Sequence, residues 1–369
     1  MRVLLWPINY FRYIGGLERL THNLALSLVS KGHSVLVVTD NPRKSQSLED
    51  NVDGINIVRL PFSHALLKKD LSLIKATTQS VYKLIEQFDP DVVNSHGWYE
   101  TMCFYQARAI DKTNKPHCLT IHGLLEQQHY QTTLCSWVWR QSKAISTVSH
   151  AIANKLNEAN LTHGNLSVIH NGAAVIEPPT PITPTKSTTI KKLLCMGRLS
   201  PEKGFDVMLH ALKRLTSRHP HIDLTIVGDG PLYNDLFALA NQLGLTLQIQ
   251  MPGMIRPHEI DEFIDDATLV VVPSTYESFG LVALEAAMRG RAVVASDVLG
   301  LREVVAHGQS GLLVPPSDPI ALADAIDSLL NDPVRLQVMG EQARIRAQQL
   351  FSLDLMTERY INMYEECLT

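Results

Sequence analysis

Short apolar runs alternate with amphipathic stretches along most of the chain. In the first half the runs occupy residues 3–6, 33–38, 91–94, 117–121 and 144–148. After the first run, Leu17, Leu20, Leu24 and Leu28 recur at the spacing of a helix that covers a hydrophobic core. Parallel sheets covered on both faces by helices require such apolar strands. The pattern therefore predicts a doubly wound α/β domain that opens with a β-α-β unit.

The same alternation begins again after a proline-rich segment. Four prolines lie between residues 177 and 189, a composition that resists helix and strand and suits an exposed linker. Further apolar runs follow at 192–196, 223–227, 268–272 and 292–295. With 369 residues the chain is long enough for two cores. We expect a Rossmann-like domain over 1–177, a linker over 178–189 and a second Rossmann-like domain over 190–354.

Two cations follow the first strand of the second domain. Gly197 and Arg198 come directly after the apolar run 192–196, and Lys203 follows Arg198 by five residues and precedes Gly204. Ligands of open α/β sheets bind beyond the carboxyl ends of the strands. Arg offers a rigid fork of donors and Lys a compact charge, so together they suit a diphosphate. Taken alone, the motif is more typical of an exposed loop with solvated charges.

A second strand-end motif surrounds the residues Ser278, Phe279 and Gly280. The run 268–272 precedes it, and a strong helix former, 281–287, follows it, so a helix should begin near residues 278–280. The free N–H groups at a helix start form an anion site. If the whole span were helical, Glu277 and Glu285 would lie about 12 Å apart along the axis. That separation argues against the close carboxyl pair of a retaining glycosidase and for two contacts at different places on one extended ligand. Glu285 could instead pair with Arg289 at i+4.

Composition and charge exclude several other classes of protein. The first 180 residues carry 17 Lys and Arg against 14 Asp and Glu, which is too mild a basic balance for a nucleic-acid binder but compatible with weak peripheral contact with anionic lipid. The five cysteines are widely spaced and show no zinc-type pattern, which favours free thiols in a reducing compartment. No apolar stretch approaches the ~18 to 20 residues that span a bilayer. We therefore expect a cytoplasmic protein. Peripheral contact with the inner face of the membrane is compatible with this expectation.

These motifs together resemble glycosyltransferase family 4, the retaining group 1 enzymes of the GT-B fold. They occur in the family's order over about residues 15 to 318. The matching positions are Gly15, Gly16, Leu17 and Glu18, His122 with Gly123, Ser149, Asn171 with Gly172, Gly197 to Leu199, Lys203 with Gly204, Gly228 to Gly230, Gly253, Glu277, Glu285, Glu303 and Gly311 to Pro315. One departure follows Asn171-Gly172, where Ala173 and Ala174 stand in place of the usual acidic residue.

The resemblance implies an architecture and a role for each matching residue. The two Rossmann-like domains would face each other across a cleft, and a C-terminal helix near 355–369 would pack back onto the first domain. Catalytic contacts would come from His122, which would lie beside the transferred sugar, from Arg198 and Lys203, which would hold the donor diphosphate, and from Glu277, which would bind sugar hydroxyls. Nucleotide-sugar contacts would come from Gly15 and Gly16 at the donor phosphate, Gly253, Met254 and Ile255 near the base, the backbone of Ser278, Phe279 and Gly280, and Glu285 at the ribose.

The same resemblance implies a reaction that needs no cofactor. A hexose-type sugar would pass from a nucleotide-sugar, a UDP-sugar first and GDP-mannose second, to a saccharide or lipid-linked acceptor, as in cell-envelope polysaccharide or glycoconjugate biosynthesis. Family members retain the anomeric configuration, with the leaving phosphate taking the acceptor proton. Nothing in the sequence resembles a D-x-D metal site, so we expect metal-independent activity. His96, which also follows a strand, is expected to support the site rather than to act in the reaction.

Other functions fit the sequence less well. A phosphorylase would need a pyridoxal lysine, for which no motif is present, and an epimerase would act without an acceptor. A catalytically silent nucleotide-sugar-binding protein would be favoured by loss of Arg198, Lys203 or Glu285, all of which are present. A dinucleotide dehydrogenase is disfavoured because no G-x-G-x-x-G follows the first strand. The sequence therefore predicts a glycosyltransferase whose sugar, base and acceptor it leaves open.

Overall fold

The computed structural model divides the chain into two compact units. It describes residues 1–10, 15–41, 48–97, 100–123, 134–159, 165–175, 191–256 and 259–369. Unit 1 comprises Met1–Gly172 and Leu353–Thr369, and unit 2 comprises Ala173–Ser352. The first boundary precedes residue 177, at which we expected the first domain to end. The expected linker 178–189 lies outside the described residues.

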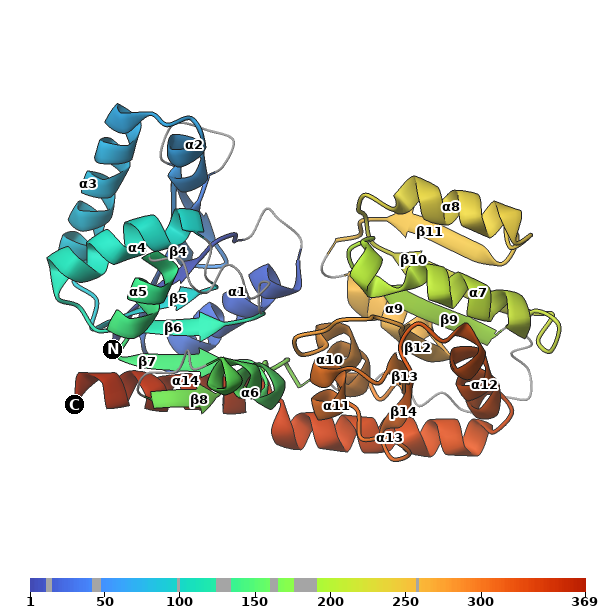
Figure 1. Ribbon diagram of the computed structural model, residues 1–369. Coiled ribbons are helices and arrows are strands. Elements are labelled where there is room, and N and C mark those ends of the chain that lie inside the picture. The colour runs from blue at the N-terminus through green and yellow to red at the C-terminus, as the bar shows by residue number, and fades with distance from the viewer. Residues whose placement is uncertain are drawn as a thin grey trace. The chain divides into compact units, whose positions relative to one another are not determined.

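Unit 1 is an eight-stranded sheet in the order β3-β4-β2-β1-β5-β6-β7-β8 (Figure 1). All neighbours pair in parallel except β3, which is antiparallel to β4. Its strands are β1 (Arg2–Pro7), β2 (Ser34–Asp40), β3 (Leu48–Val52), β4 (Ile55–Leu60), β5 (Val92–His96), β6 (His117–Ile121), β7 (Ala144–Thr147) and β8 (Asn165–Val168). Its helices are α1 (Gly16–Ser30), α2 (Phe62–Leu67), α3 (Leu71–Phe88), α4 (Glu100–Thr113), α5 (Leu134–Gln141), α6 (His150–Glu158) and α14 (Leu353–Leu368).

Strand β1 shows how the two faces of this sheet are filled. Val3 and Leu5 join a buried cluster with α1 and α14, whereas Leu4 and Trp6 join a second cluster with α2, α3 and α4. Successive side chains of a strand point to opposite faces, so a strand covered on both sides favours apolar side chains at every position. The continuous apolar run at 3–6 follows directly from this double burial.

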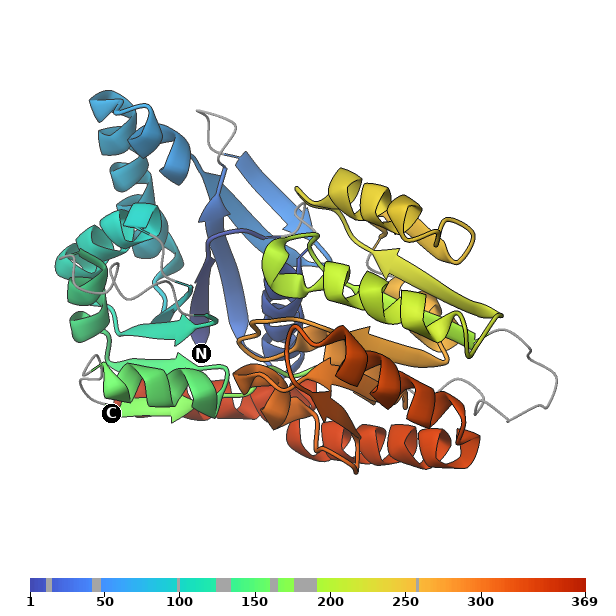
Figure 2. The ribbon, with the colours of Figure 1, turned by 45° about the vertical axis from the view of Figure 1, so that its right-hand side comes forward.

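The C-terminal helix α14 is an integral part of unit 1. The hydroxyl of Tyr364 donates to Asn94 Oδ1 at 2.7 Å, and the hydroxyl of Thr357 donates to Ser27 Oγ at 2.9 Å. Cys367 Sγ lies 3.1 Å from Cys118 Sγ in β6, and both thiols are free and buried. The last residues of the chain therefore pack against the sheet of unit 1, and Figure 2 shows part of α14 in red behind the green strands.

Unit 2 is a six-stranded, wholly parallel sheet in the order β11-β10-β9-β12-β13-β14. Its strands are β9 (Lys191–Met196), β10 (Ile222–Val227), β11 (Ile249–Gly253), β12 (Leu269–Val272), β13 (Val293–Ser296) and β14 (Gly311–Val314). Its helices are α7 (Phe205–Leu215), α8 (Tyr233–Gln242), α9 (Ile260–Asp266), α10 (Leu281–Met288), α11 (Leu299–Val304), α12 (Pro319–Leu330) and α13 (Pro333–Leu350), with a 3-10 turn η2 (Pro201–Lys203).

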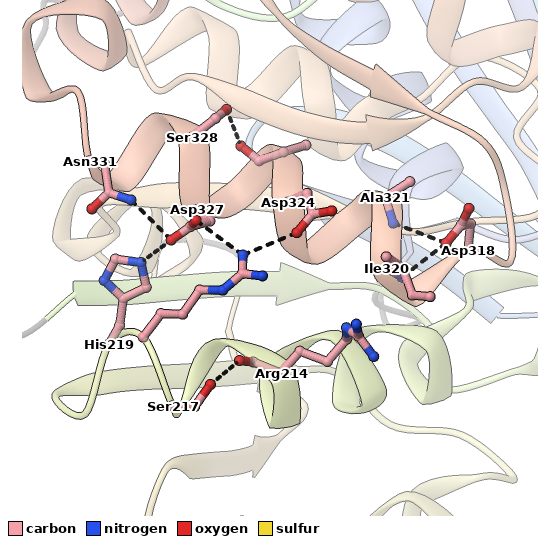
Figure 3. Close-up of polar contacts among 12 residues, drawn as sticks. Arg214, Ser217, His219, Asp318, Ile320, Ala321, Asp324, Asp327, Ser328 and Asn331 are labelled. Carbon is pink, nitrogen blue, oxygen red and sulfur yellow. Dashed lines mark hydrogen bonds and ion pairs between the residues drawn. The ribbon is translucent and has the colours of Figure 1, made fainter.

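Polar contacts join α12 to the chain just beyond α7 on the surface of unit 2 (Figure 3). Asp327 accepts from His219 Nε2 at 2.7 Å and from Arg218 at 3.1 Å, while Arg218 also donates to Asp324. Asp318 caps the start of α12 by accepting from the N–H groups of two residues in its first turn. These contacts lie on packed helices and fix their orientation.

Both units are thus doubly wound α/β structures, which confirms the predicted fold class. None of the described helices combines the length and the apolar character needed to cross a bilayer.

Candidate active site

The two cations predicted to bind phosphate both follow β9. Arg198 is exposed two residues beyond the strand, and Lys203 closes the turn η2. Among the residues that the structure describes, no side chain forms a hydrogen bond or ion pair with the Arg198 guanidinium. Its donors are therefore available to a ligand at this strand end.

Lys203 is held by an ion pair with Glu277. Its Nζ lies 2.5 Å from Glu277 Oε1, and the hydroxyl of the buried Ser274 donates to the same oxygen at 3.1 Å. The side chains of Lys203 and Glu277 are only 24% and 14% exposed, so solvent screens the pair less than an exposed one. Lys203, predicted to hold the diphosphate, is thus in direct contact with Glu277, predicted to bind the sugar. A phosphate at Lys203 would compete with Glu277 for the ammonium group.

A glycine and several backbone hydrogen bonds bring these loops together. Gly204 has φ +64°, and a Cβ there would collide with the carbonyl oxygen of Pro273. Beside it, Thr275 N donates to the carbonyl of Glu202 at 2.8 Å. Only glycine combines the left-handed conformation with this close approach, so the loop after β9 can lie against the loop after β12.

The segment predicted to lie near the base follows β11. Gly253 ends that strand, and its carbonyl accepts from Gly228 N at 2.9 Å, so the loops after β10 and β11 are joined. Met254 is 55% exposed and Ile255 is half-buried. The apolar side chain of Met254 is therefore open to a planar ligand.

Helix α10 begins where the sequence predicted a helix start. Gly280, with φ +103°, is its N-cap, and Phe279 is buried against Phe351 with 5.6 Å between the ring centroids. Phe279 can thus offer a ligand only its backbone. Because the helix starts at Leu281, Glu277 lies outside it, and the separation of about 12 Å that we derived for a continuous helix from Glu277 to Glu285 does not apply.

Glu285 lies half-buried on α10. Arg289, considered above as its partner, forms ion pairs with Asp265 and with Asp261, the latter at 3.5 Å. The guanidinium is thus strongly engaged by α9, and hydrogen bonding to Asp265 raises its pKa. The two acidic partners of Arg289 that the structure describes therefore both come from α9.

In unit 1, Gly15 and Gly16 form the exposed beginning of α1. Gly15 is the N-cap, and the Glu18 carboxylate lies so close that a Cβ on Gly15 would collide with it. Burial raises the pKa of Glu18, while hydrogen bonds from its own N–H and from Asn9 act in the opposite direction. The Glu18 carboxylate thus accepts from an N–H in the first turn of α1, and a donor phosphate at Gly15 and Gly16 would have to compete with it.

His122 follows β6 and contacts His96, the last residue of β5. Their rings stack with 5.3 Å between centroids, and His96 Nδ1 lies 3.0 Å from His122 Nε2. Burial lowers the pKa of His122 to about 3, and burial together with the neighbouring His122 places the pKa of His96 well below its usual range. Both imidazoles are neutral at physiological pH, so they can exchange hydrogen bonds with hydroxyl groups but carry no charge.

Two family models match the chain, one in each half. The model described as Glycosyltransferase Family 4 matches residues 14–175, and the model described as Glycosyl transferases group 1 matches residues 183–346. A D-inositol 3-phosphate glycosyltransferase of Corynebacterium aurimucosum is 30% identical over 391 residues, covering 96% of this chain and 92% of the relative. The chain belongs to the family 4 glycosyltransferases.

Other relatives of this glycosyltransferase agree with that assignment. A glycogen synthase of Mycobacterium tuberculosis is 29% identical over 399 residues and covers 99% of this chain and 94% of its own length. Among solved structures, Anabaena HepE in complex with UDP and glucose superposes with a TM-score of 0.79 at 20% identity, over 98% of this chain and 99% of that chain. The chain is therefore a transferase of the GT-B fold.

Sequence reasoning missed Ser274 at the candidate site and could not place His96 beside His122. Ser274 is not among the residues predicted from the sequence, although its position two residues after β12 and three residues before Glu277 was a usable signal. His96 was expected only to support the site, and its contact with His122 could not be derived because the two residues are 26 positions apart. Their proximity depends on the parallel pairing of β5 with β6.

Proposed function

We propose that this glycosyltransferase moves a hexose-type sugar from a nucleotide-sugar to a saccharide or lipid-linked acceptor. A UDP-sugar is the first candidate donor and GDP-mannose the second. The observation that carries the proposal is the contact of Lys203, after β9, with Glu277 and Ser274, after β12, with Arg198 exposed at the same end of β9. The Anabaena structure holds UDP and glucose, which supports a donor of this type.

Each charged residue has a distinct task in this reaction. Arg198 and Lys203 neutralise the charge that grows on the departing diphosphate, and such preorganised donors act mainly in the transition state. Glu277 binds hydroxyls of the transferred sugar, and Ser274 keeps its carboxylate in place. Glu285 binds the ribose, a contact that changes little as the sugar leaves. The protein thus contributes positioning and charge stabilisation.

The stereochemistry and the lack of a metal are also part of the proposal. The acceptor attacks on the face from which the diphosphate leaves, so the anomeric configuration is retained, and a diphosphate oxygen takes the acceptor proton. With two cations at the diphosphate, a divalent ion has no necessary role in neutralising it. Proton NMR of the product linkage tests retention, and an inverted linkage would refute it.

A thermal-shift panel tests the donor class. Purified protein is melted with UDP, GDP, ADP and CDP at equal concentrations, because a ligand that binds only the folded state stabilises it by ~2.7 kcal/mol at a concentration of 100 Kd. We expect one diphosphate, UDP first, to give the largest shift. The matched control is Arg198→Ala, which should lose most of the shift while keeping the unliganded Tm. A panel in which no diphosphate stabilises the wild type would overturn the proposal.

The same preparation then separates transfer from related reactions. With the matching nucleotide-sugar and a panel of saccharide and glycolipid acceptors, we expect a new glycosidic linkage whose rate depends on acceptor concentration. Conversion of the nucleotide-sugar to an isomer without acceptor would instead identify an epimerase.

A further inference from the structure

His96 is enclosed at the end of β5 and makes one polar side-chain contact that the structure describes. It is 1% exposed and pairs in register with Pro7 of β1 and with Thr120 of β6. The ring centroids of His96 and of Tyr360, on α14, are 5.8 Å apart. Two strands and the C-terminal helix therefore hold the imidazole, and its orientation toward His122 is determined by packing.

The hydrogen bond between the two rings constrains the protons of both. A neutral imidazole carries one N–H donor and one acceptor nitrogen. Burial keeps both rings neutral, as the lowered pKa values of His96 and His122 indicate. A bond between His96 Nδ1 and His122 Nε2 therefore has one of two forms, in which either His96 or His122 is the donor.

The second nitrogen of His96 distinguishes these forms. His96 Nε2 is buried and has no hydrogen-bond partner among the described residues. If His122 donated, the proton of His96 would sit on Nε2 as a buried N–H without an acceptor. If His96 donates through Nδ1, its Nε2 is an unprotonated acceptor. Buried orphan N–H groups are rarer than under-satisfied acceptors, so the second form is favoured.

From this we infer that His96 is a positioning residue that fixes His122 as its Nδ1–H tautomer. The inference deepens the proposed function and rests on it for the identity of the ligand. His122 then offers a neutral N–H donor to a hydroxyl oxygen of the transferred sugar, and its remaining acceptor nitrogen is occupied by His96. His122 in this form holds the sugar and is not a proton acceptor in the reaction.

Nuclear magnetic resonance of histidine nitrogens tests the tautomer without any assay of activity. In protein labelled with 15N-histidine, two-bond and three-bond couplings to the ring protons show which nitrogen carries the proton. We expect wild-type His122 to be protonated on Nδ1, and an Nε2–H pattern would overturn the inference. A failure of the proposed function would show separately, as the lack of any nucleotide-dependent thermal shift in the wild type.

Two substitutions of His96 distinguish the effect of its N–H donor from the effect of its side-chain size. His96→Asn keeps an N–H donor near the place of Nδ1, whereas His96→Phe keeps a ring and removes the donor. We expect the Phe variant to lose the Nδ1–H pattern at His122 and about tenfold in kcat, the size of one net hydrogen bond. The Asn variant should retain the pattern and recover kcat to within about threefold of wild type.

His117 provides a matched control at the opposite end of β6. It is also buried, burial lowers its pKa to about 3, and its two nitrogens contact Ser95 Oγ and Ser142 Oγ at 2.8 and 2.9 Å. His117→Asn should lower Tm while leaving the His122 tautomer and kcat near wild type. An equal kcat loss in His117→Asn and His96→Phe, or an unchanged tautomer in His96→Phe, would refute the positioning role.

Discussion

At its strand ends unit 2 presents charged side chains, whereas unit 1 presents neutral imidazoles. Lys203 and Glu277 form a partly buried ion pair beside the exposed Arg198. His96 and His122 form a stacked, hydrogen-bonded pair whose pKa values are lowered by burial. Both units are doubly wound sheets that are parallel apart from β3 in unit 1, so the difference lies in the side chains and their solvation and not in the fold.

This difference matches two kinds of ligand chemistry. A diphosphate carries charge, and charged partners that remain near solvent can neutralise it without a large desolvation cost. A sugar carries hydroxyls, and neutral donors in a dry site bind them with fixed geometry. In our proposal, unit 2 stabilises the leaving group and unit 1 orients the sugar. Substitution of a site residue should therefore have different effects in the two units.

The largest expected effect is loss of a cation from unit 2. Arg198→Ala and Lys203→Ala should each lower kcat by about 10²- to 10³-fold, the typical cost of removing one preorganised donor from a developing anion. Steady-state kinetics beside melting curves measure both activity and folding.

Lys192 is the matched control for that experiment. It also lies on β9 and forms an ion pair with Asp266 at 2.7 Å, but the two side chains are 45% and 66% exposed. Exposed pairs contribute ~0 to 1 kcal/mol, so Lys192→Ala should remain near wild type in kcat. Near-normal kinetics for folded Arg198→Ala and Lys203→Ala would remove the distinction between the units.

The next effect is a loss of unit 1 stability in mild acid. The pKa of buried His117 falls to about 3 on folding, so between about pH 6.5 and pH 3 the unfolded state binds a proton that the folded state does not. Stability is therefore fully present above about pH 6.5 and falls by up to about 1.4 kcal/mol per pH unit for each such histidine as the pH decreases.

Hydrogen exchange of unit 1 peptides between pH 7 and pH 5 measures this loss. Burial raises the pKa values of Glu18 and Asp40, which act with the opposite sign, so the test is the difference between wild type and His117→Gln. In unit 1 the variant should show a shallower pH dependence than wild type. In unit 2 the pH dependence should be the same in the variant and in wild type. Equal slopes in wild type and variant would contradict the assignment of His117 as a buried neutral base.

A smaller and qualitatively different effect is expected at Glu285. Glu285→Ala should raise KM for the nucleotide-sugar by about tenfold with little change in kcat, because a contact equal in ground and transition states affects binding alone. Isothermal titration with the nucleoside diphosphate would measure the same loss directly. A large fall in kcat at unchanged KM would place Glu285 at the reacting centre.

The smallest expected effect is that of metal removal. If the cations of unit 2 supply the charge that diphosphate departure needs, EDTA should leave the transfer rate within error of the untreated enzyme. Assays with and without Mg²⁺ or Mn²⁺ decide this. A rate abolished by EDTA and restored by either ion would show that Arg198 and Lys203 are insufficient.

The sequence by itself determined the fold class and the family. Continuous apolar runs predicted β1, β5, β6, β9, β12 and β13 close to their observed bounds, because strands buried on both faces are mostly apolar. The polar residues that such strands do bury, among them Asn94 and His96 in β5, have hydrogen-bond partners. It did not predict β3 (Leu48–Val52), an edge strand with Glu49 and Asp50 in its middle and only partial burial. An edge strand is covered less, so its composition carries a weaker signal.

Only the tertiary structure decided which functional side chains meet. Lys203 and Glu277 are 74 positions apart, and His96 and His122 are 26 apart. Each pair forms because neighbouring loops follow parallel strands that end at the same edge of a sheet. A sequence shows which residues follow strands, but strand order and register decide which of those residues touch, and burial at that edge decides whether they are charged.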